Sequence, residues 1–195
     1  MAETPSHSAR EWRGYRWTQR DLLLVGNTGL VCGIVAAGVG AIRPVLLAHT
    51  GLGFLSLLLI ALATNIFLFP SLFTAAWTRR ISAAVTTQLL VALVIVLLTP
   101  LSWRFILDGL FVGLLCEGAF ALTTRYRRTG VWSLALAGLL VGVVRSPVTF
   151  LGHPVAGLWS PVMVAIVLTT VGVAAGYGAL AAYAATWFQR RAEKQ

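Results

Sequence analysis

The stretch that decides the fold is residues 81–99, ISAAVTTQLLVALVIVLLT, which carries no charged side chain. A bilayer core of about 30 Å needs roughly 20 apolar residues per helix, so this stretch is long enough to cross it. Similar stretches recur along the chain, and together they predict six membrane-spanning helices. The six predicted helices are Asp21–Ile42, Leu52–Phe73, Ile81–Thr99, Phe105–Thr123, Val131–Phe150 and Trp159–Phe188. The predicted fold class is therefore an all-α polytopic membrane protein, a bundle of six transmembrane helices.

The composition of the 195 residues supports this interpretation. Apolar side chains make up 58% of the chain and charged ones 11%, whereas soluble domains contain roughly 45–50% and 25%. The mean hydropathy is +0.84. A soluble core of this size could not bury so much apolar surface. The composition thus excludes a soluble enzyme, a disordered tail and a disulfide scaffold.

The basic residues are divided unequally between the two ends of the predicted helices. One end collects Arg10, Arg13, Arg16, Arg20, Arg79, Arg80, Arg125, Arg127, Arg128, Arg190, Arg191 and Lys194, and the other has only Arg43, Arg104 and Arg145. Because loops rich in Lys and Arg stay in the cytoplasm, this bias predicts that both termini are cytoplasmic. Tryptophans near both helix ends agree, since their amphipathic rings anchor in the headgroup region.

This topology predicts three parts of the chain. Residues 1–20 form a basic cytoplasmic tail, residues 21–189 the transmembrane domain, and residues 190–195 a second cytoplasmic tail. The net charge of +9 is explained by the basic residues at the predicted cytoplasmic ends. The sequence contains no nucleic-acid-binding motif, so no nucleic-acid partner is expected. The predicted location is the cytoplasmic membrane of a bacterium, with lipid as the surrounding partner.

Several side chains inside the predicted helices are polar and need an explanation in lipid. Asp108 either balances Arg104 or Arg145 or contacts a ligand, and these alternatives stay open. Asn65 and Gln88 act either as hydrogen-bonding residues between helices or as ligand contacts. Arg104 and Arg43 are expected to reach the headgroups. Thr86 and Thr87 are expected to hydrogen-bond to their own helix.

Glu117 is the acidic residue that lipid tolerates least. It lies roughly 20 Å below Arg104 along the helix, and no basic residue is expected at its depth. Glu117 is therefore protonated, hydrogen-bonded to neutral groups, or directed into a polar cavity. Asp108 lies nine positions earlier, about 180° around the axis, so one straight helix does not aim both carboxyls at one pocket. Glu117 is the stronger candidate for a binding site.

The first predicted helix carries small residues at four-residue intervals: Gly29, Gly33, Ala37 and Ala41. This spacing produces a flat side suited to close helix packing. The sequence leaves open whether another helix of the same chain or a partner protein packs there.

Signatures of catalysis and cofactor binding are missing from the sequence. There is no His-Glu-x-x-His, no Gly-x-Ser-x-Gly and no phosphate-binding loop, so neither enzyme activity nor a resident metal or cofactor is expected. Cys32 and Cys116 lie in apolar stretches without a Cys-x-x-Cys partner. Of the three histidines, His153 lies in an expected outer loop, where it is either a ligand contact or a solvated residue.

The plan of six helices with cytoplasmic ends resembles the substrate-binding S components of energy-coupling-factor (ECF) vitamin transporters. The opening RWTQRDLLLV, residues 16–25, looks like the start of many of them. The fourth predicted helix is similar to that of YkoE-type S components, which are associated with thiamine or its hydroxymethylpyrimidine precursor. The residues that carry this similarity are Gly109, Gly113, Glu117, Phe120, Thr124, Arg125 and Tyr126.

The resemblance implies a subunit without its own ATPase that captures a vitamin outside the cell. A transmembrane coupling (T) subunit and two cytoplasmic ATPase subunits would then drive release. In that family a small-residue face of the first helix contacts the coupling subunit, and Gly33, Ala37 and Ala41 are the matching candidates.

The residues themselves suggest an outward-opening pocket between the last three predicted helices. Its expected lining includes Trp103, Trp159, Arg145 and Glu117, and the further candidate ligand contacts are Asp108, His153 and Asn65. Aromatic faces suit a planar, cationic heterocycle, and a buried carboxylate accepts hydrogen bonds from an aminopyrimidine. Three alternatives remain open: a stand-alone carrier or channel, an accessory subunit without a ligand, and a membrane-embedded enzyme.

Overall fold

The structure, a computed structural model, describes residues 17–50, 59, 61–63, 65–100, 103–126, 129–151 and 161–192. The helices are α2 (Gln19–Thr50), α4 (Leu68–Thr78), α5 (Ala83–Leu98), α6 (Arg104–Thr124), α7 (Val131–Leu151) and α8 (Pro161–Ala192). The described residues form helices and turns and contain no strand, which confirms the all-α prediction.

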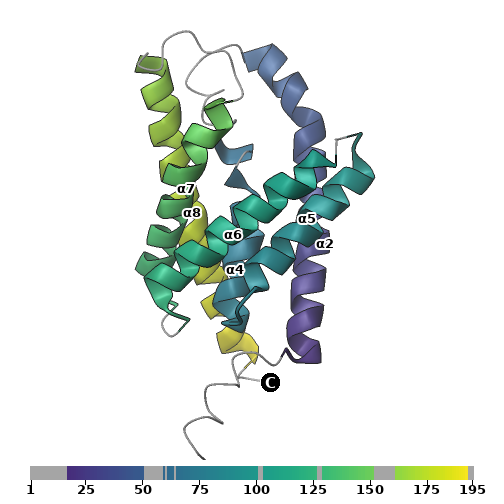
Figure 1. Cartoon of the computed structure of the whole chain (residues 1–195), viewed down its shortest axis with the longest axis vertical. Coiled ribbons are helices and arrows are strands. Elements are labelled where there is room, and N and C mark those ends of the chain that lie inside the picture. The colour runs from purple at the N-terminus through teal and green to yellow at the C-terminus, as the bar shows by residue number, and fades with distance from the viewer. Residues whose placement is uncertain are drawn as a thin grey trace, which may run out of the picture.

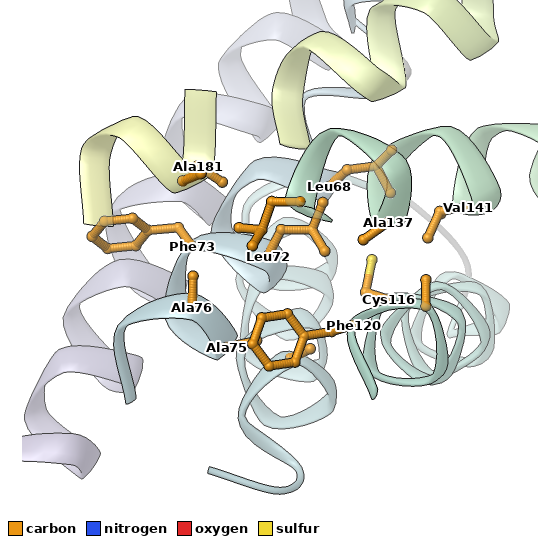
Figure 2. Close-up of a cluster of buried hydrophobic side chains, with 14 of the residues drawn as sticks. Leu68, Leu72, Phe73, Ala75, Ala76, Cys116, Phe120, Ala137, Val141 and Ala181 are labelled. Carbon is orange, nitrogen blue, oxygen red and sulfur yellow. The ribbon is translucent and has the colours of Figure 1, made fainter. Parts of the chain in front are cut away.

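The helices form a bundle around α4. In Figure 1, α7 and α8 stand side by side, α2 lies on the opposite side of the molecule, and α5 and α6 cross obliquely between them. Leu68 and Leu72 of α4 are fully buried in the main apolar core. Figure 2 shows these two leucines between Ala181 of α8 and Ala137 of α7. The core is therefore assembled around α4, with α6, α7 and α8 packed against it.

The outer surface of the bundle is apolar, as lipid requires. Large side chains such as Leu97 and Leu122 are more than 70% exposed. Within the described residues, three helices are long and apolar enough to cross a membrane: Gln19–Ile42, Arg104–Thr124 and Val167–Arg191. Ala83–Leu98 and Val131–Ser146 are shorter apolar helices. The described part of the chain is thus a helical bundle with three helices suited by length and composition to cross a membrane.

The second predicted helix, Leu52–Phe73, differs from the observed one. Ile66 and Phe67 form a turn, and α4 begins at Leu68 and continues to Thr78. Pro70 has no N–H group to donate to the carbonyl of Ile66, so a regular helix cannot run unchanged through this point. Residues 51–58, 60 and 64 of this prediction lie outside the described part of the chain.

Glycines allow the helices to approach closely. A Cβ atom at Gly178 of α8 would overlap the backbone carbonyl of Leu134 in α7, and one at Gly138 would overlap the carbonyl of Ala174. In α6, a Cβ atom at Gly113 would lie 2.9 Å from Cα of Val85 in α5. Small residues therefore permit backbone-to-backbone packing at these two interfaces.

Candidate functional site

Glu117 lies beside the first turn of α5 and serves as its cap. The backbone N–H groups of Ser82 and Ala84 each donate to the Glu117 carboxylate at 3.0 Å. The Tyr126 hydroxyl donates a third hydrogen bond to the same carboxylate. Ser82, the N-cap residue, has φ 70° and makes no side-chain cap of its own. A carboxylate from another helix thus satisfies the free N–H groups of α5 and complements its positive end.

This arrangement corresponds to one of the three states expected for Glu117, hydrogen bonding to neutral groups. Glu117 precedes the end of α6 at Thr124 by seven residues, about 10 Å along the helix. Burial and the hydrogen bond to Glu117 raise the pKa of Tyr126, which lies beyond the end of α6. No local sequence signal predicts this cap, because its partners are 33–35 residues apart in the chain.

A second polar contact, between Asp21 and Arg80, lies at the same end of the bundle. The Asp21 carboxylate of α2 is 3.3 Å from Nε of Arg80, which follows α4. Asp21 also accepts a hydrogen bond from the N–H of Thr18 at 3.0 Å, and its own N–H donates to the Thr18 hydroxyl at 3.2 Å. This reciprocal pair is a capping box, with Asp in the third helical position. The Thr-x-x-Asp spacing in RWTQRDLLLV was the sequence signal for it.

Arg145 and Asp108 form an ion pair towards the opposite end of the bundle. Arg145 of α7 is only 8% exposed, and its guanidinium lies 3.8 Å from the half-exposed Asp108 carboxylate of α6. The neighbouring Ser146 is fully buried and donates to the carbonyl of Gly142 at 2.7 Å. Of the two partners considered for Asp108, the structure therefore shows contact with Arg145. Arg104 is exposed at the start of α6.

Asn65 is a fully buried amide at the break before α4. Its Nδ2 donates to the carbonyl of Ala61 at 2.8 Å and to that of Thr170 in α8 at 3.4 Å. Its Oδ1 has no hydrogen-bond partner among the described residues. Both neighbours are acceptors, so rotating the amide would place oxygen against two carbonyl oxygens. The acceptor without a partner is therefore Oδ1.

Asn65 lies about one helical turn from the level of Ser146. Thr170, which accepts from Asn65, directly precedes Val171. A Cβ atom at Gly142 would lie 3.1 Å from Cα of Val171, and Ser146 donates to the carbonyl of that same glycine. We refer to four residues, Asn65, Asp108, Arg145 and Ser146, as the Asn65–Arg145 cluster. The cluster joins polar groups from the α4 entry, α6 and α7.

Gln88 lies in a different environment and joins two helices. The Ser71 hydroxyl of α4 donates to its Oε1 at 2.6 Å. One turn away, the hydroxyls of Thr74 and Thr87 are 2.8 Å apart. This confirms the interhelical alternative for Gln88. Thr86 and Thr87 also donate to the carbonyls four residues earlier, which confirms the expected back-bonding.

Two of the three α2 residues predicted to contact a partner subunit pack against another helix of this chain. Gly33 is buried, and a Cβ atom there would lie 2.7 Å from Cβ of Val94 in α5. Ala37 is 6% exposed and belongs to a core cluster with Val91 of α5. The internal-packing alternative therefore describes Gly33 and Ala37, which α5 covers. Ala41 is exposed.

The structure does not show the aromatic and histidine candidates packed around the cluster in the part of the chain that it describes. Trp103 is 65% exposed at the start of α6. Trp159 and His153 lie outside the described residues. The structure thus pairs Arg145 with Asp108, places Asn65 against α8, and uses Glu117 to cap α5.

Comparison with known proteins gives the family. No curated protein matches the chain. A solved structure described as an S-component of an ECF transporter aligns with a TM-score of 0.73 at 22% sequence identity, covering 87% of this chain and 83% of that one. The overall fold is thus that of an S component, while the YkoE-type subgroup stays a prediction. The profile of one family matches residues 20–144, more than half of the sequence, and on that basis the chain belongs to the family of ABC-type cobalt transport system permease components.

Proposed function

We propose that the protein is the substrate-binding membrane subunit of an ECF-type importer. In this role it captures a vitamin or vitamin precursor outside the cell, while a separate T subunit and two ATPase subunits drive uptake. The observation that carries this proposal is a bundle with the S-component fold that buries both Arg145 and Asn65. Arg145 lies six residues before the end of α7 at Leu151, about 9 Å along the helix.

A buried charge near the outer end of α7 favours a binding role. Placing an arginine within lipid costs several kcal/mol, so such residues mark substrate pathways more often than scaffold positions. Asp108 offsets part of this cost, but its side chain is 46% exposed. An ion pair with one accessible partner can exchange that partner for a polar group of a ligand.

The proposed topology has six crossings, with both termini in the cytoplasm of a bacterium. Two contacts support it: Asp21 near the start of α2 pairs with Arg80, and Gln189 near the end of α8 donates to the carbonyl of Trp77 at 3.3 Å. Both contacts lie at the α4–α5 connection, so the start and the end of the described bundle lie at one end. That end carries Arg20, Arg79, Arg80, Arg125, Arg190 and Arg191, as the positive-inside rule requires.

The proposed substrate is an organic molecule that binds at the Asn65–Arg145 cluster. The family description names cobalt, and the described residues contain no group of three or more His, Cys, Asp or Glu side chains that could hold a metal ion. Thiamine and hydroxymethylpyrimidine, which the YkoE-type similarity suggests, are the first candidates. Recognition of an aminopyrimidine by Glu117 would require its carboxylate to leave Ser82, Ala84 and Tyr126. We therefore place the ligand at the cluster, with Trp103, Trp159 and His153 as proposed outer contacts and Ala41 as a proposed T-subunit contact.

The test is binding by purified protein in lipid nanodiscs. Thiamine, hydroxymethylpyrimidine and Co²⁺ are titrated separately against the wild type, Arg145→Ala and the control Arg104→Ala. We expect saturable pyrimidine binding that Arg145→Ala weakens by more than tenfold and that Arg104→Ala changes less than threefold. Binding of Co²⁺ alone, or equal pyrimidine affinity in all three proteins, would contradict the proposal. Uptake in cells without ATPase partners would instead identify a stand-alone carrier.

A further inference from the structure

We infer that Asn65 determines substrate specificity by accepting a hydrogen bond from a ring amino group of the ligand. The inference rests on the proposed function and adds the recognising atom, Oδ1 of Asn65. Its basis is an acceptor that is fully buried and that lacks a partner among the described residues. Buried polar groups in native proteins are nearly always satisfied, so such an atom calls for a donor from outside the chain.

The position of Asn65 in the helix supports a ligand role. Ile66 and Phe67 form a turn between Asn65 and α4, which begins at Leu68, although Phe67 keeps helical dihedral angles and the Ile66 N–H still donates to the carbonyl of Leu62. Interrupted helices within a membrane are tolerated where they line a cavity, and they commonly carry substrate contacts. The peptide that precedes the break is held against α8, because the Tyr177 hydroxyl donates to the carbonyl of Leu62 at 3.3 Å and Asn65 donates to that of Thr170.

The hydrogen bonds made by Nδ2 of Asn65 fix the orientation of the amide, and this orientation determines which ligand group Oδ1 can bind. Nδ2 is directed to the carbonyls of Ala61 and Thr170, so the amide cannot rotate to offer a donor to the ligand without losing both hydrogen bonds. Asn65 therefore selects a ligand group that donates, such as an aromatic amine, and disfavours a carbonyl at the same position. Discrimination of this kind is strong, because a mismatched ligand leaves two buried acceptors facing each other.

Gln88 provides a matched comparison inside the same protein. It is also a buried amide, 3% exposed, but its Oε1 accepts from Ser71 at 2.6 Å. Its acceptor is therefore occupied by the chain itself. Replacing either amide removes hydrogen bonds within the chain, but only replacing Asn65 also removes an acceptor that the described residues leave unused.

The experiment compares ligand pairs that differ only at the amino group. Thiamine and its 4-oxo analogue oxythiamine, and hydroxymethylpyrimidine and its 4-oxo analogue, are titrated against the wild type, Asn65→Leu and Gln88→Leu in nanodiscs. We expect the wild type and Gln88→Leu to prefer the amino compounds by more than tenfold. Asn65→Leu should bind both members of a pair within threefold of each other.

The outcomes separate the two proposals. If the wild type binds pyrimidines but the amino preference survives in Asn65→Leu, the specificity role is wrong and the proposed function stands. If the wild type binds none of the four compounds, both the aminopyrimidine substrate class and this role of Asn65 are overturned. If Asn65→Leu does not fold, Asn65→Ser, which keeps a small polar group but shortens its reach, takes its place, with the same loss of preference expected.

Discussion

The backbone N–H of Ser82 donates to the carboxylate of Glu117 at 3.0 Å, so the first turn of α5 is capped by a side chain from α6. This contact joins two helices near the basic end of the bundle, where the α4–α5 connection and Tyr126 also meet. Its chemistry gives the first prediction.

Glu117→Gln should destabilise the bundle without abolishing ligand binding. The amide keeps one acceptor but loses the charge that complements the α5 N-terminus, a loss of about 1–2 kcal/mol. Thermal unfolding in detergent, followed by tryptophan fluorescence, measures the change. The neighbouring Gly118→Ala is the control, because a Cβ atom there meets nothing within 4 Å. Unchanged stability with a tenfold loss of thiamine affinity would instead assign Glu117 to the pocket.

Comparison of Tyr126→Phe with the wild type should show that Tyr126 stabilises the fold at neutral pH and that this stabilisation is lost at alkaline pH. Burial and the hydrogen bond to Glu117 raise the pKa of Tyr126 above the ordinary value of about 10. The unfolded chain therefore ionises first, and the stabilisation is complete below about pH 10 and is lost as the pH rises further. The difference in unfolding temperature between the wild type and Tyr126→Phe should narrow above that pH. A constant difference from neutral to strongly alkaline pH would contradict this assignment.

Ser71 and Gln88 should be energetically coupled. Their 2.6 Å hydrogen bond joins α4 to α5 in the apolar interior, where such pairs contribute about 0.5–1.5 kcal/mol. A double-mutant cycle with Ser71→Ala and Gln88→Leu measures the coupling as the departure from additivity. Additive effects of the two substitutions would show that the pair contributes nothing beyond its separate residues.

Gly178→Ala should disrupt the α7–α8 interface. The added methyl group would overlap the carbonyl of Leu134, and neither backbone can yield without separating the helices. We expect a loss of at least about 2 kcal/mol, in the range of overpacked cores. Gly172→Ala on the same helix is the matched control, because its Cβ atom meets nothing within 4 Å. Equal unfolding temperatures for the two variants would refute the close approach.

The uninterrupted apolar stretches made the helical fold predictable, because lipid leaves the backbone no partner but itself. The back-bonding of Thr87 followed from the same principle, whereas the sequence left Gln88 open between an interhelical hydrogen bond and a ligand contact. The start of α2 was also readable, since Thr18 and Asp21 have the spacing of a capping box. The break at Ile66–Phe67 was missed because hydropathy does not register the missing N–H of Pro70.

The sequence by itself determined that this is an all-helical membrane protein, because apolar content and helix length depend only on composition along the chain. Only the tertiary structure decided what each polar side chain does. Asp108 and Glu117 share α6, yet one pairs with Arg145 of α7 and the other caps α5. Asn65 and Gln88 are both buried amides, yet only Gln88 has its acceptor occupied by a described neighbour. Such differences depend on contacts between helices far apart in the chain, and helix periodicity alone does not contain them.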